Sequence, residues 1–388
     1  MKTILIRTTR IIIALVLGSS LFILLSYAGG KSKGPLDDMA VLLNKNLASI
    51  EKKMVDTRDS RSASLDWFNK YRNNKGMLLK PDMLFLGAYD DNTAESYESV
   101  IALEEAIGTH LPVMSLYCAW GSKRNHVFPV LRAQAIYDLG SMPLITWEPW
   151  LDVFDAQFFP EGTNELQRNK NGMKAVAVGK FDAYIDKWAT DAKNFNAPFF
   201  LRFGHEMNDP YRYPWGPQNN TSEDFIAAWK HVRERFKLIG ANNAIWVWSP
   251  HPAYSYKEYY PGIENVDWIG VTTINYGTVA TWSKWWSFDD IFEKFYADVS
   301  FYKKPMMLTE FGSLSVGGDR SQWFQSAFES LHVKYPVVKA LIFFHVANDN
   351  TTTYKSLDWS FINDERSVSV LWHCIDKMEQ RYGLGGEE

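Results

Sequence analysis

Two glutamates follow short apolar segments of the sequence, where a carboxylate is well placed for chemistry. Glu206 comes after the segment 199–203, and Glu310 comes after the segment 306–309. Two carboxyl groups that face one cleft can cleave a glycosidic bond. One protonates the leaving oxygen, and the other, about 5–5.5 Å away in a retaining enzyme, attacks the anomeric carbon. We therefore predict Glu206 as the acid/base and Glu310 as the nucleophile.

A single glutamate at a strand end more often forms a salt bridge or caps a helix, so it is the pair that favours catalysis. We expect Arg202 and Tyr276 to donate hydrogen bonds to Glu310, and we expect His205 and Asn208 to orient groups around the acid. The acid must hold a proton near neutral pH, which requires burial or a nearby negative charge to raise its pKa.

The chain is rich in aromatic residues, with 16 Trp, 19 Tyr and 24 Phe. Their flat apolar faces suit sugar rings, although a large core also needs bulky side chains. Glu148 is a third carboxylate between two tryptophans, and we assign it a structural or substrate-binding role. The predicted substrate-binding residues are Trp147, Trp150, Trp215, Trp282, Trp285, Trp286 and His345.

Other chemistries find little support in the sequence. His205 and Glu206 resemble the start of a zinc-protease motif, but position 209, where that motif needs a second histidine, is Asp. The G-x-S-x-G match at residues 30–34 falls at the start of the predicted linker and not at a strand-to-helix turn, where a serine hydrolase needs it. The two cysteines, Cys118 and Cys374, are either free thiols or one long-range bridge, and they cannot form a cysteine metal site. We predict neither metal nor cofactor, and the net charge of −4 does not suit nucleic acid.

Apolar runs that are typical of buried strands alternate with amphipathic helical patterns. The strand candidates are 83–88, 112–117, 143–147, 199–203, 244–248, 268–274, 306–309 and 340–344, and the helical stretches are 95–107, 126–139, 179–195, 222–239, 287–303, 319–333 and 367–381. Eight such units predict a (β/α)₈ barrel. The rival is an open doubly wound sheet, which usually has a glycine-rich phosphate turn after its first strand, and residues 87–91 lack one.

The first 30 residues are typical of a targeting segment. Three basic residues, Lys2, Arg7 and Arg10, precede the mostly apolar run 11–28, which suits either a cleaved signal peptide or an uncleaved membrane anchor. Both alternatives predict export, with the chain at the extracellular or periplasmic face. We expect residues 31–76 to be a linker with a possible helix, and residues 77–388 to form a monomeric catalytic domain.

Several segments together resemble glycoside hydrolase family 26, in which a histidine immediately precedes the acid/base glutamate. The matching segments are 201–208 (LRFGHEMN), 213–216 (YPWG), 246–250 (WVWSP), 275–277 (NYG) and 309–312 (TEFG), in family order across about residues 80–380. The resemblance implies retaining endo-hydrolysis of β-1,4-mannan, mixed-linkage β-1,3-1,4-glucan or β-1,3-xylan without a cofactor. It also implies that Tyr276, on the sixth strand, hydrogen-bonds the nucleophile.

The chain departs from the family pattern at two places near the scissile bond. Asp209 and Pro210 replace the usual glycine, and residues 343–345 replace a tryptophan platform of the mannanases. The YPWG segment is more similar to the mixed-linkage glucanase branch or to hydrolases encoded with polysaccharide-export systems. We predict an endo-acting hydrolase of mannan or mixed-linkage glucan. The alternatives are a non-hydrolytic carbohydrate-binding barrel and a transglycosylase in exopolysaccharide assembly or export.

Overall fold

A computed structural model describes residues 49–50, 52–53, 56, 60–91, 96–123, 125–161, 163–280, 282–351 and 355–384. The chain divides into two units, Met1–Glu51 and Lys52–Glu388. The second unit contains all the elements described below. The predicted signal or anchor segment lies outside the described residues. Within the described residues, no helix has the length and apolar character needed to cross a membrane.

Eight parallel strands form a closed barrel in which each strand pairs with the next and β8 pairs with β1. The strands are β1 (Phe85–Tyr89), β2 (Val113–Ala119), β3 (Met142–Glu148), β4 (Phe199–Phe203), β5 (Ala244–Trp248), β6 (Trp268–Asn275), β7 (Met306–Ser313) and β8 (Val338–Phe344). The predicted (β/α)₈ architecture is confirmed. Such a barrel gathers functional groups at the C-terminal ends of its strands.

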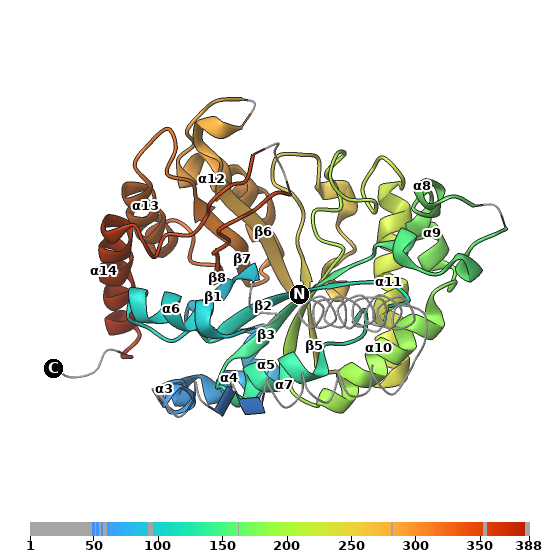
Figure 1. Cartoon of the computed structure of the whole chain (residues 1–388), viewed down its shortest axis with the longest axis horizontal. Helices are drawn as coiled ribbons and strands as arrows, with labels where there is room; N and C mark the ends of the chain where they lie inside the picture. Colours follow the sequence, from blue (N-terminus) through green and yellow to red (C-terminus); the bar gives the residue numbers. More distant parts are fainter. Residues whose placement is uncertain are drawn as a thin grey trace, which may run out of the picture. The chain divides into compact units, whose positions relative to one another are not determined.

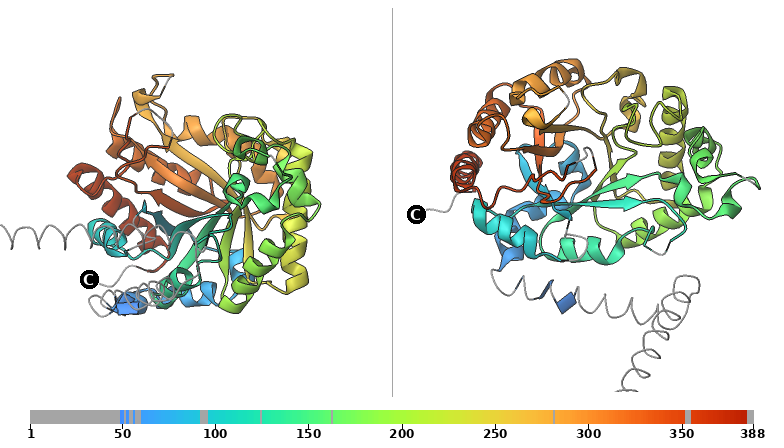
Figure 2. Two further views of the ribbon diagram at one scale, coloured as in Figure 1. Left: turned by 45° about the vertical axis from the view of Figure 1, so that its right-hand side comes forward. Right: turned by 45° about the horizontal axis from the view of Figure 1, so that its top comes forward.

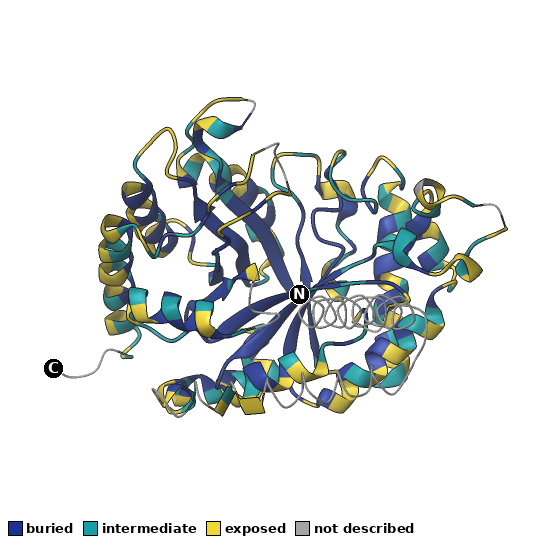
Figure 3. Cartoon of the chain, in the orientation of Figure 1, coloured by how far each residue is buried: buried dark blue, intermediate teal, exposed yellow. Residues whose placement is uncertain are grey.

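Helices surround the barrel (Figure 1; Figure 2). They are α6 (Glu98–Ile107), α7 (Val130–Asp138), α8 (Glu165–Arg168), α9 (Gly172–Ala177), α10 (Asp182–Phe195), α11 (Ser222–Ile239), α12 (Phe288–Val299), α13 (Arg320–Val333) and α14 (Glu365–Arg381). The strands are buried almost throughout, whereas the helices are buried on one side and exposed on the other (Figure 3). This pattern explains why the strands are continuous apolar runs and the helices are amphipathic.

Three short helices near the start of the second unit pack against the barrel. They are α3 (Arg61–Ser64), α4 (Asn69–Arg72) and α5 (Lys75–Leu79), which lie at the lower edge of Figure 1. Phe68, Tyr71 and Leu78 are buried in a cluster with residues from the first halves of the strands. Part of the segment predicted as a linker over 31–76 thus packs on the barrel, and the domain bounds stay a prediction. The apolar residues of this segment close the barrel end from which the strands begin.

Arg61 anchors this segment to the barrel wall. Its guanidinium is completely buried and forms a bidentate pair with Glu104, at 2.9 and 2.6 Å. It also donates to the carbonyl oxygens of Leu111 and Leu139 and to the hydroxyl of Ser141. The positive charge of Arg61 and the bonds from His110 and Leu111 lower the pKa of Glu104, although burial alone would raise it.

The two cysteines do not bridge. Cys118 is buried on β2 and Cys374 is half-buried on α14, and both are free. Burial raises the pKa of the Cys118 thiol to about 12, so this side chain is an inert part of the core.

The buried Arg61–Glu104 pair gives a prediction for stability. Arg61→Met should lower the free energy of unfolding by about 3–5 kcal/mol, because it leaves a buried carboxylate without its cation. Chemical denaturation of the full chain measures this change. Lys187→Met is the control, because its pair with Asp191 is largely exposed, and it should cost less than about 1 kcal/mol. Equal losses in the two variants would contradict the anchoring role of Arg61.

Candidate active site

A bend after β4 holds the predicted acid/base. Glu206 has a φ of 51°, a left-handed conformation that is uncommon for a residue with a side chain. Its amide donates to the carbonyl oxygen of Ser249 at 2.7 Å, which ties the end of β4 to the end of β5. Gly204 is also left-handed, and a Cβ there would lie 3.1 Å from the ring of Phe225, so a side chain would force that ring to shift. The strained backbone is thus set by its neighbours, as is common at functional sites.

A break in the strand register brings the predicted nucleophile into the barrel mouth. The pairing of β7 shifts against both β6 and β8 near Glu310, so that Glu310 lies beside Thr272 of β6. Bulges of this kind re-aim side chains and are frequent next to active sites. Glu310 is 7% exposed, and its backbone carbonyl accepts a hydrogen bond from the hydroxyl of Thr273 at 3.3 Å.

Glu310 receives two donors on the same oxygen. Nη2 of Arg202 lies 2.9 Å from its Oε1, and the hydroxyl of Tyr117 donates to that oxygen at 2.7 Å. Arg202 also donates to the hydroxyls of Tyr117, at 2.6 Å, and Thr146, at 2.8 Å. The guanidinium is fully buried, so side chains from β2, β3, β4 and β7 meet around one cation. The predicted contact of Arg202 with Glu310 is present.

The sequence analysis does not single out Tyr117, which donates a hydrogen bond to Glu310. Burial raises the pKa of Tyr117 well above its usual value despite the opposing charge of Arg202, so Tyr117 remains a proton donor. Tyr276 packs edge-to-face against Trp282 and Trp359, with ring centroids 6.1 and 5.0 Å away. Its hydrogen bond to the nucleophile stays a prediction.

Positive and polar groups surround the carboxyl group of Glu206, which is 1% exposed. Nη1 of Arg212 lies 3.4 Å from Oε2 of Glu206. Burial raises the pKa of Glu206, but His251, Arg212, Thr272 and Arg202 together outweigh it and hold the pKa below its usual value. We expected a raised pKa for an acid. Burial is present as foreseen, and the cations reverse its effect.

Asp209 and His251 complete the surroundings of Glu206. The three residues place ligand-type atoms within 4.8 Å of one another, which is the spacing of a metal-binding trio. The positive charge of Arg212 opposes a cation here, and a metal would occupy the carboxylate that glycosidic cleavage requires. We therefore interpret the cluster as a modulator of the acid/base. Asp209 and His251 lie in the loops after β4 and β5, where the alternation of apolar and polar residues does not indicate which side chains come together.

His205 and Asn208, which flank Glu206 in the sequence, pack and hydrogen-bond against the loops that surround it. His205 is buried, and burial together with Arg202 and Arg212 lowers its pKa well below the usual value, so the ring is neutral. Its ring lies edge-to-face with Tyr213 at 4.6 Å. The side chain of Asn208 exchanges two hydrogen bonds of 2.8 Å with the backbone of His251. Asn208 therefore fixes the loop after β5, which carries His251.

Two of the predicted sugar-binding tryptophans are core residues. Trp147 is 0% exposed and stacks on Trp188 of α10 at 4.3 Å, because its side chain points outward from the strand to the helices. Trp215 is 1% exposed, donates to the carbonyl oxygen of His205 and stacks on Tyr213. Neither ring has a free face in this structure. Sequence position places both near the mouth, but strand alternation turns Trp147 away from it.

The other predicted sugar-binding residues are either more exposed than Trp147 and Trp215 or hydrogen-bonded to an acidic side chain. Trp150 is half-buried and donates to Oε2 of Glu148 at 3.2 Å, whereas Trp282 is 56% exposed. Trp285 and Trp286 are half-buried, and Lys284 covers one face of Trp286. His345 is buried, and its Nδ1 lies 3.1 Å from Oδ2 of Asp90. Sugar contacts by Trp150, Trp282, Trp285, Trp286 and His345 stay predictions.

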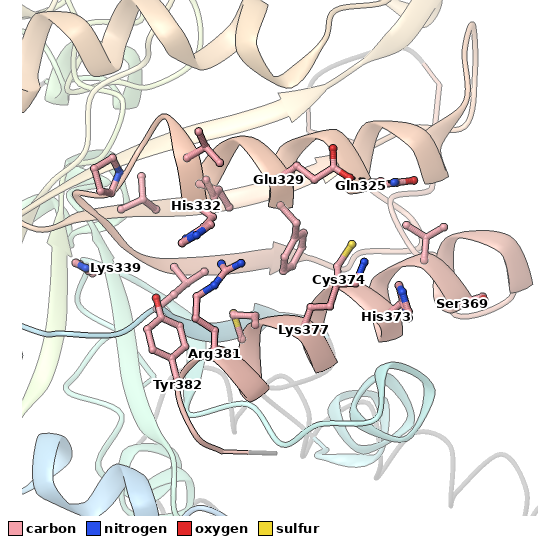
Figure 4. Close-up of a pocket in the computed structure, with 18 residues that line it drawn as sticks. Gln325, Glu329, His332, Lys339, Ser369, His373, Cys374, Lys377, Arg381 and Tyr382 are labelled. Carbon is pink, nitrogen blue, oxygen red and sulfur yellow. Dashed lines mark hydrogen bonds between the residues drawn. The ribbon is translucent and has the colours of Figure 1, made fainter. Parts of the chain in front are cut away.

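A cavity of about 670 Å³ lies elsewhere, between α13 and α14 on the outside of the barrel (Figure 4). His332, Lys377 and Arg381 line it, and neither Glu206 nor Glu310 does. We nevertheless place the candidate site at the barrel mouth. The paired carboxylates and their buried cations are there, and cavity size alone supplies no chemistry.

Two carboxyl groups near the buried cation of Arg202, at the C-terminal end of a (β/α)₈ barrel, are the kind of arrangement that glycoside hydrolases use. Residues 155–311, which include both glutamates, match the model of glycosyl hydrolase family 26. Endoglucanase H of Acetivibrio thermocellus is 32% identical over 293 residues, which are 73% of this chain and 29% of that protein. The sequence resemblance to glycoside hydrolase family 26, a family of O-glycosyl hydrolases, is confirmed.

Other relatives are more distant. The β-1,3-xylanase TXYA of a Vibrio species is 28% identical over 124 residues, 30% of this chain and 26% of that protein. The chain thus spans less than a third of the length of these two relatives. Among solved structures, a family-26 β-mannanase from Bacteroides ovatus has a TM-score of 0.56 and 17% identity over 82% of this chain and 94% of that one. A Bacillus subtilis mannanase has a TM-score of 0.53 and 17% identity over 81% and 90%. The structural likenesses show the shared fold.

Glu148 gives a pH-dependent prediction. Burial raises its pKa to about 7, with Glu310 adding to the rise and Trp150, Arg202 and Arg212 opposing it. The folded chain therefore binds this proton more tightly than the unfolded chain does. The stability that protonated Glu148 contributes is fully present at a pH below the pKa of Glu148 in the unfolded chain. This stability is lost as the pH rises to about 7, the pKa of Glu148 in the folded chain.

Denaturation of wild type and Glu148→Gln between pH 4 and 8 tests this linkage. The stability of wild type relative to the variant should fall by up to roughly 3 kcal/mol across the window and then level off. Glu161→Gln, which changes an exposed glutamate, is the control and should show no such trend. A flat difference for Glu148→Gln would show that this carboxyl group titrates normally.

Proposed function

We propose that the chain is a retaining, endo-acting glycoside hydrolase of β-linked polysaccharides. The observation that supports this most strongly is the pair of donors, Arg202 and Tyr117, on one oxygen of Glu310. Two charge-stabilising donors suit a carboxylate that stays ionised and attacks carbon. Glu206, a buried carboxyl group on the bend after β4, suits proton transfer. A binding barrel would not need this division of roles.

In the proposed mechanism, Glu206 gives its proton to the glycosidic oxygen while an oxygen of Glu310 attacks the anomeric carbon. The carbon–oxygen bond to the leaving sugar breaks, and a glycosyl ester forms on Glu310. Glu206 then takes a proton from water, whose oxygen attacks the same carbon and releases Glu310. A sugar hydroxyl in place of water would give transglycosylation at the same site.

The substrate that we propose first is mixed-linkage β-1,3-1,4-glucan, with β-1,4-mannan second. The relative that aligns with 73% of this chain is named an endoglucanase. At the end of β8, Phe343 is wholly buried and His345 is bound to Asp90, so neither offers the flat exposed face of a tryptophan platform. Incubation of the full chain with mixed-linkage glucan, mannan, β-1,3-xylan and carboxymethyl cellulose, followed by product analysis, identifies the substrate.

Replacement of each glutamate tests the proposed roles. Glu206→Ala and Glu310→Ala should each lower hydrolysis by about a thousandfold or more while the fold is retained. With an aryl β-glycoside that has a good leaving group, azide should restore turnover in both variants but give different products. Azide replaces the nucleophile in Glu310→Ala and yields the inverted α-glycosyl azide. In Glu206→Ala it attacks the glycosyl ester and yields the retained β-glycosyl azide.

Product configuration is read by nuclear magnetic resonance (NMR) spectroscopy. Wild-type rates in either variant, or the same azide anomer from both, would contradict the assignment. Glu161→Ala, which removes an exposed carboxyl group, is the control and should leave hydrolysis unchanged.

Tyr117 supplies a further test of the donor pair. Tyr117→Phe removes one of the two donors to Glu310 at nearly constant volume, so kcat should fall about 10- to 100-fold. Tyr184→Phe is the matched control, because its hydroxyl is also buried but bonds to the backbone of His126, outside the site. If the two variants lose equal activity, the hydroxyl of Tyr117 has no special part in catalysis.

A further inference from the structure

Arg212 pairs with Glu206, and this pairing conflicts with the proposed role of Glu206 as the general acid. A general acid must hold a proton and touch the leaving oxygen. In the free protein, however, the side chain of Glu206 is 1% exposed and pairs with Arg212 at 3.4 Å. An adjacent guanidinium favours the ionised carboxylate, and a covered carboxyl group cannot reach a sugar. One of the groups around Glu206 must therefore move when substrate binds.

The groups that face Glu206 come from several elements of the barrel mouth. They are Arg202 on β4, Asp209, Arg212 and Tyr213 in the following loop, His251 and Tyr254 after β5, and Thr272 on β6. Among them, Arg202 is held by Glu310, Tyr117 and Thr146. His251 is held through its backbone by Asn208, and its Nδ1 accepts a hydrogen bond from the amide of Ala253.

Of the three basic residues in this set, Arg212 is held by the longest hydrogen bond. Its side chain is 26% exposed, and its one hydrogen bond to Glu206 is long, at 3.4 Å. The loop beneath it is fixed at both ends. The amide of Asp209 bonds to the carbonyl oxygen of Glu206, and the indole of Trp215 bonds to that of His205. The side chain can therefore turn about its own bonds while the loop and the site keep their shape.

Arg212 contacts Tyr213 and Glu206 and also interacts electrostatically with Glu310. Its guanidinium lies over the ring of Tyr213 at 5.2 Å. The charges of Tyr213, Glu206, Tyr276 and Glu310 raise its pKa, although burial alone would lower it. Arg212 is thus always charged and lies close to both proposed catalytic carboxylates. A guanidinium has five N–H donors, so Arg212 can also donate hydrogen bonds to sugar hydroxyls.

We propose that Arg212 is a positioning residue that covers Glu206 and keeps it ionised in the free enzyme, and that moves to the bound sugar when substrate enters. This inference rests on the proposed function. When Arg212 leaves, Glu206 loses its nearest cation and becomes accessible to the glycosidic oxygen. Glu206 takes one proton from solvent for each substrate bound. Protonation of the acid is thereby coupled to occupation of the cleft.

The first test is a carboxyl titration of the free protein by ¹³C NMR. The resonance of Glu206 is assigned by its loss in Glu206→Gln. In Arg212→Met its midpoint should rise by about one pH unit or more, because an opposite charge at this distance lowers a carboxyl pKa by about 1–3 units. Arg212→Lys keeps the charge and should keep the wild-type midpoint. An unchanged midpoint in Arg212→Met would overturn the proposal without any assay of activity.

The second test follows the motion through kinetics on a mixed-linkage gluco-oligosaccharide. The pH profile of kcat/KM reports the free enzyme, and that of kcat reports the complex. In the pH profile of kcat/KM, Arg212→Met should shift the pH at which the titration of Glu206 changes the rate. In the pH profile of kcat, the same variant should shift that pH only a little. Arg233→Met is the control, since its pair with Asp267 has the same 26% exposed arginine and a similar distance of 3.5 Å. A uniform fall of kcat at every pH would assign Arg212 a merely structural role.

Proton uptake separates this inference from the proposed function. Calorimetric binding of the oligosaccharide to Glu310→Gln, in buffers of different ionisation enthalpy, should show uptake of about one proton at neutral pH. The double variant with Arg212→Met should show markedly less uptake. If the oligosaccharide binds without proton uptake in either protein, the role proposed for Arg212 is wrong. The proposal that the chain is a hydrolase is not affected by that result. Failure of wild type to cleave any β-glycan overturns the proposed function itself.

Discussion

The arrangement depends on one buried cation, the guanidinium of Arg202. A fully buried positive charge is tolerated only when nearby groups replace the water that it has lost. Glu310 supplies the counter-charge, while Tyr117 and Thr146 supply acceptor oxygens. These partners belong to four strands, so the cation fixes the relative positions of β2, β3, β4 and β7 at the mouth of the barrel. Loss of Glu310 would remove the carboxylate that is hydrogen-bonded to Arg202. The nucleophile is therefore part of what stabilises the site as well as part of its chemistry.

The two carboxylates are treated differently by their surroundings, and this difference matches the two roles. Glu310 is pinned by short bonds from rigid strand residues, which suits a group that must attack one carbon atom. Glu206 stands on a strained bend and is paired through one long bond to a loop arginine that is partly exposed. A group that must bind and release a proton needs such an adjustable environment. The burial that would make Glu206 a good acid is already present, and in our proposal its effect on the pKa is released when Arg212 moves away.

Much of the architecture can be predicted from the sequence because it depends on local patterns. The runs 199–203 and 244–248 have the observed bounds of β4 and β5, since buried parallel strands are continuous apolar segments between polar loops. The same patterns place Glu206, Glu310 and Arg202 at strand ends. What cannot be predicted depends on three-dimensional neighbours. Trp147 points to α10 rather than into the mouth, Tyr117 reaches Glu310 from a strand that shows no motif, and Arg212 lies in a loop without periodicity. The packing of residues 60–79 under the barrel was likewise hidden by their charged sequence.

The most direct measurement of the central claim is covalent trapping of the nucleophile. A 2-deoxy-2-fluoro β-glycoside with a good leaving group slows breakdown of the glycosyl ester more than its formation, so the intermediate accumulates. Mass spectrometry of the intact chain and of its peptides then locates the label. We predict one sugar per chain, attached to the peptide that contains Glu310 and absent in Glu310→Ala. A label on Glu206 or Glu148, or turnover of the natural substrate with inversion and no label, would contradict the account.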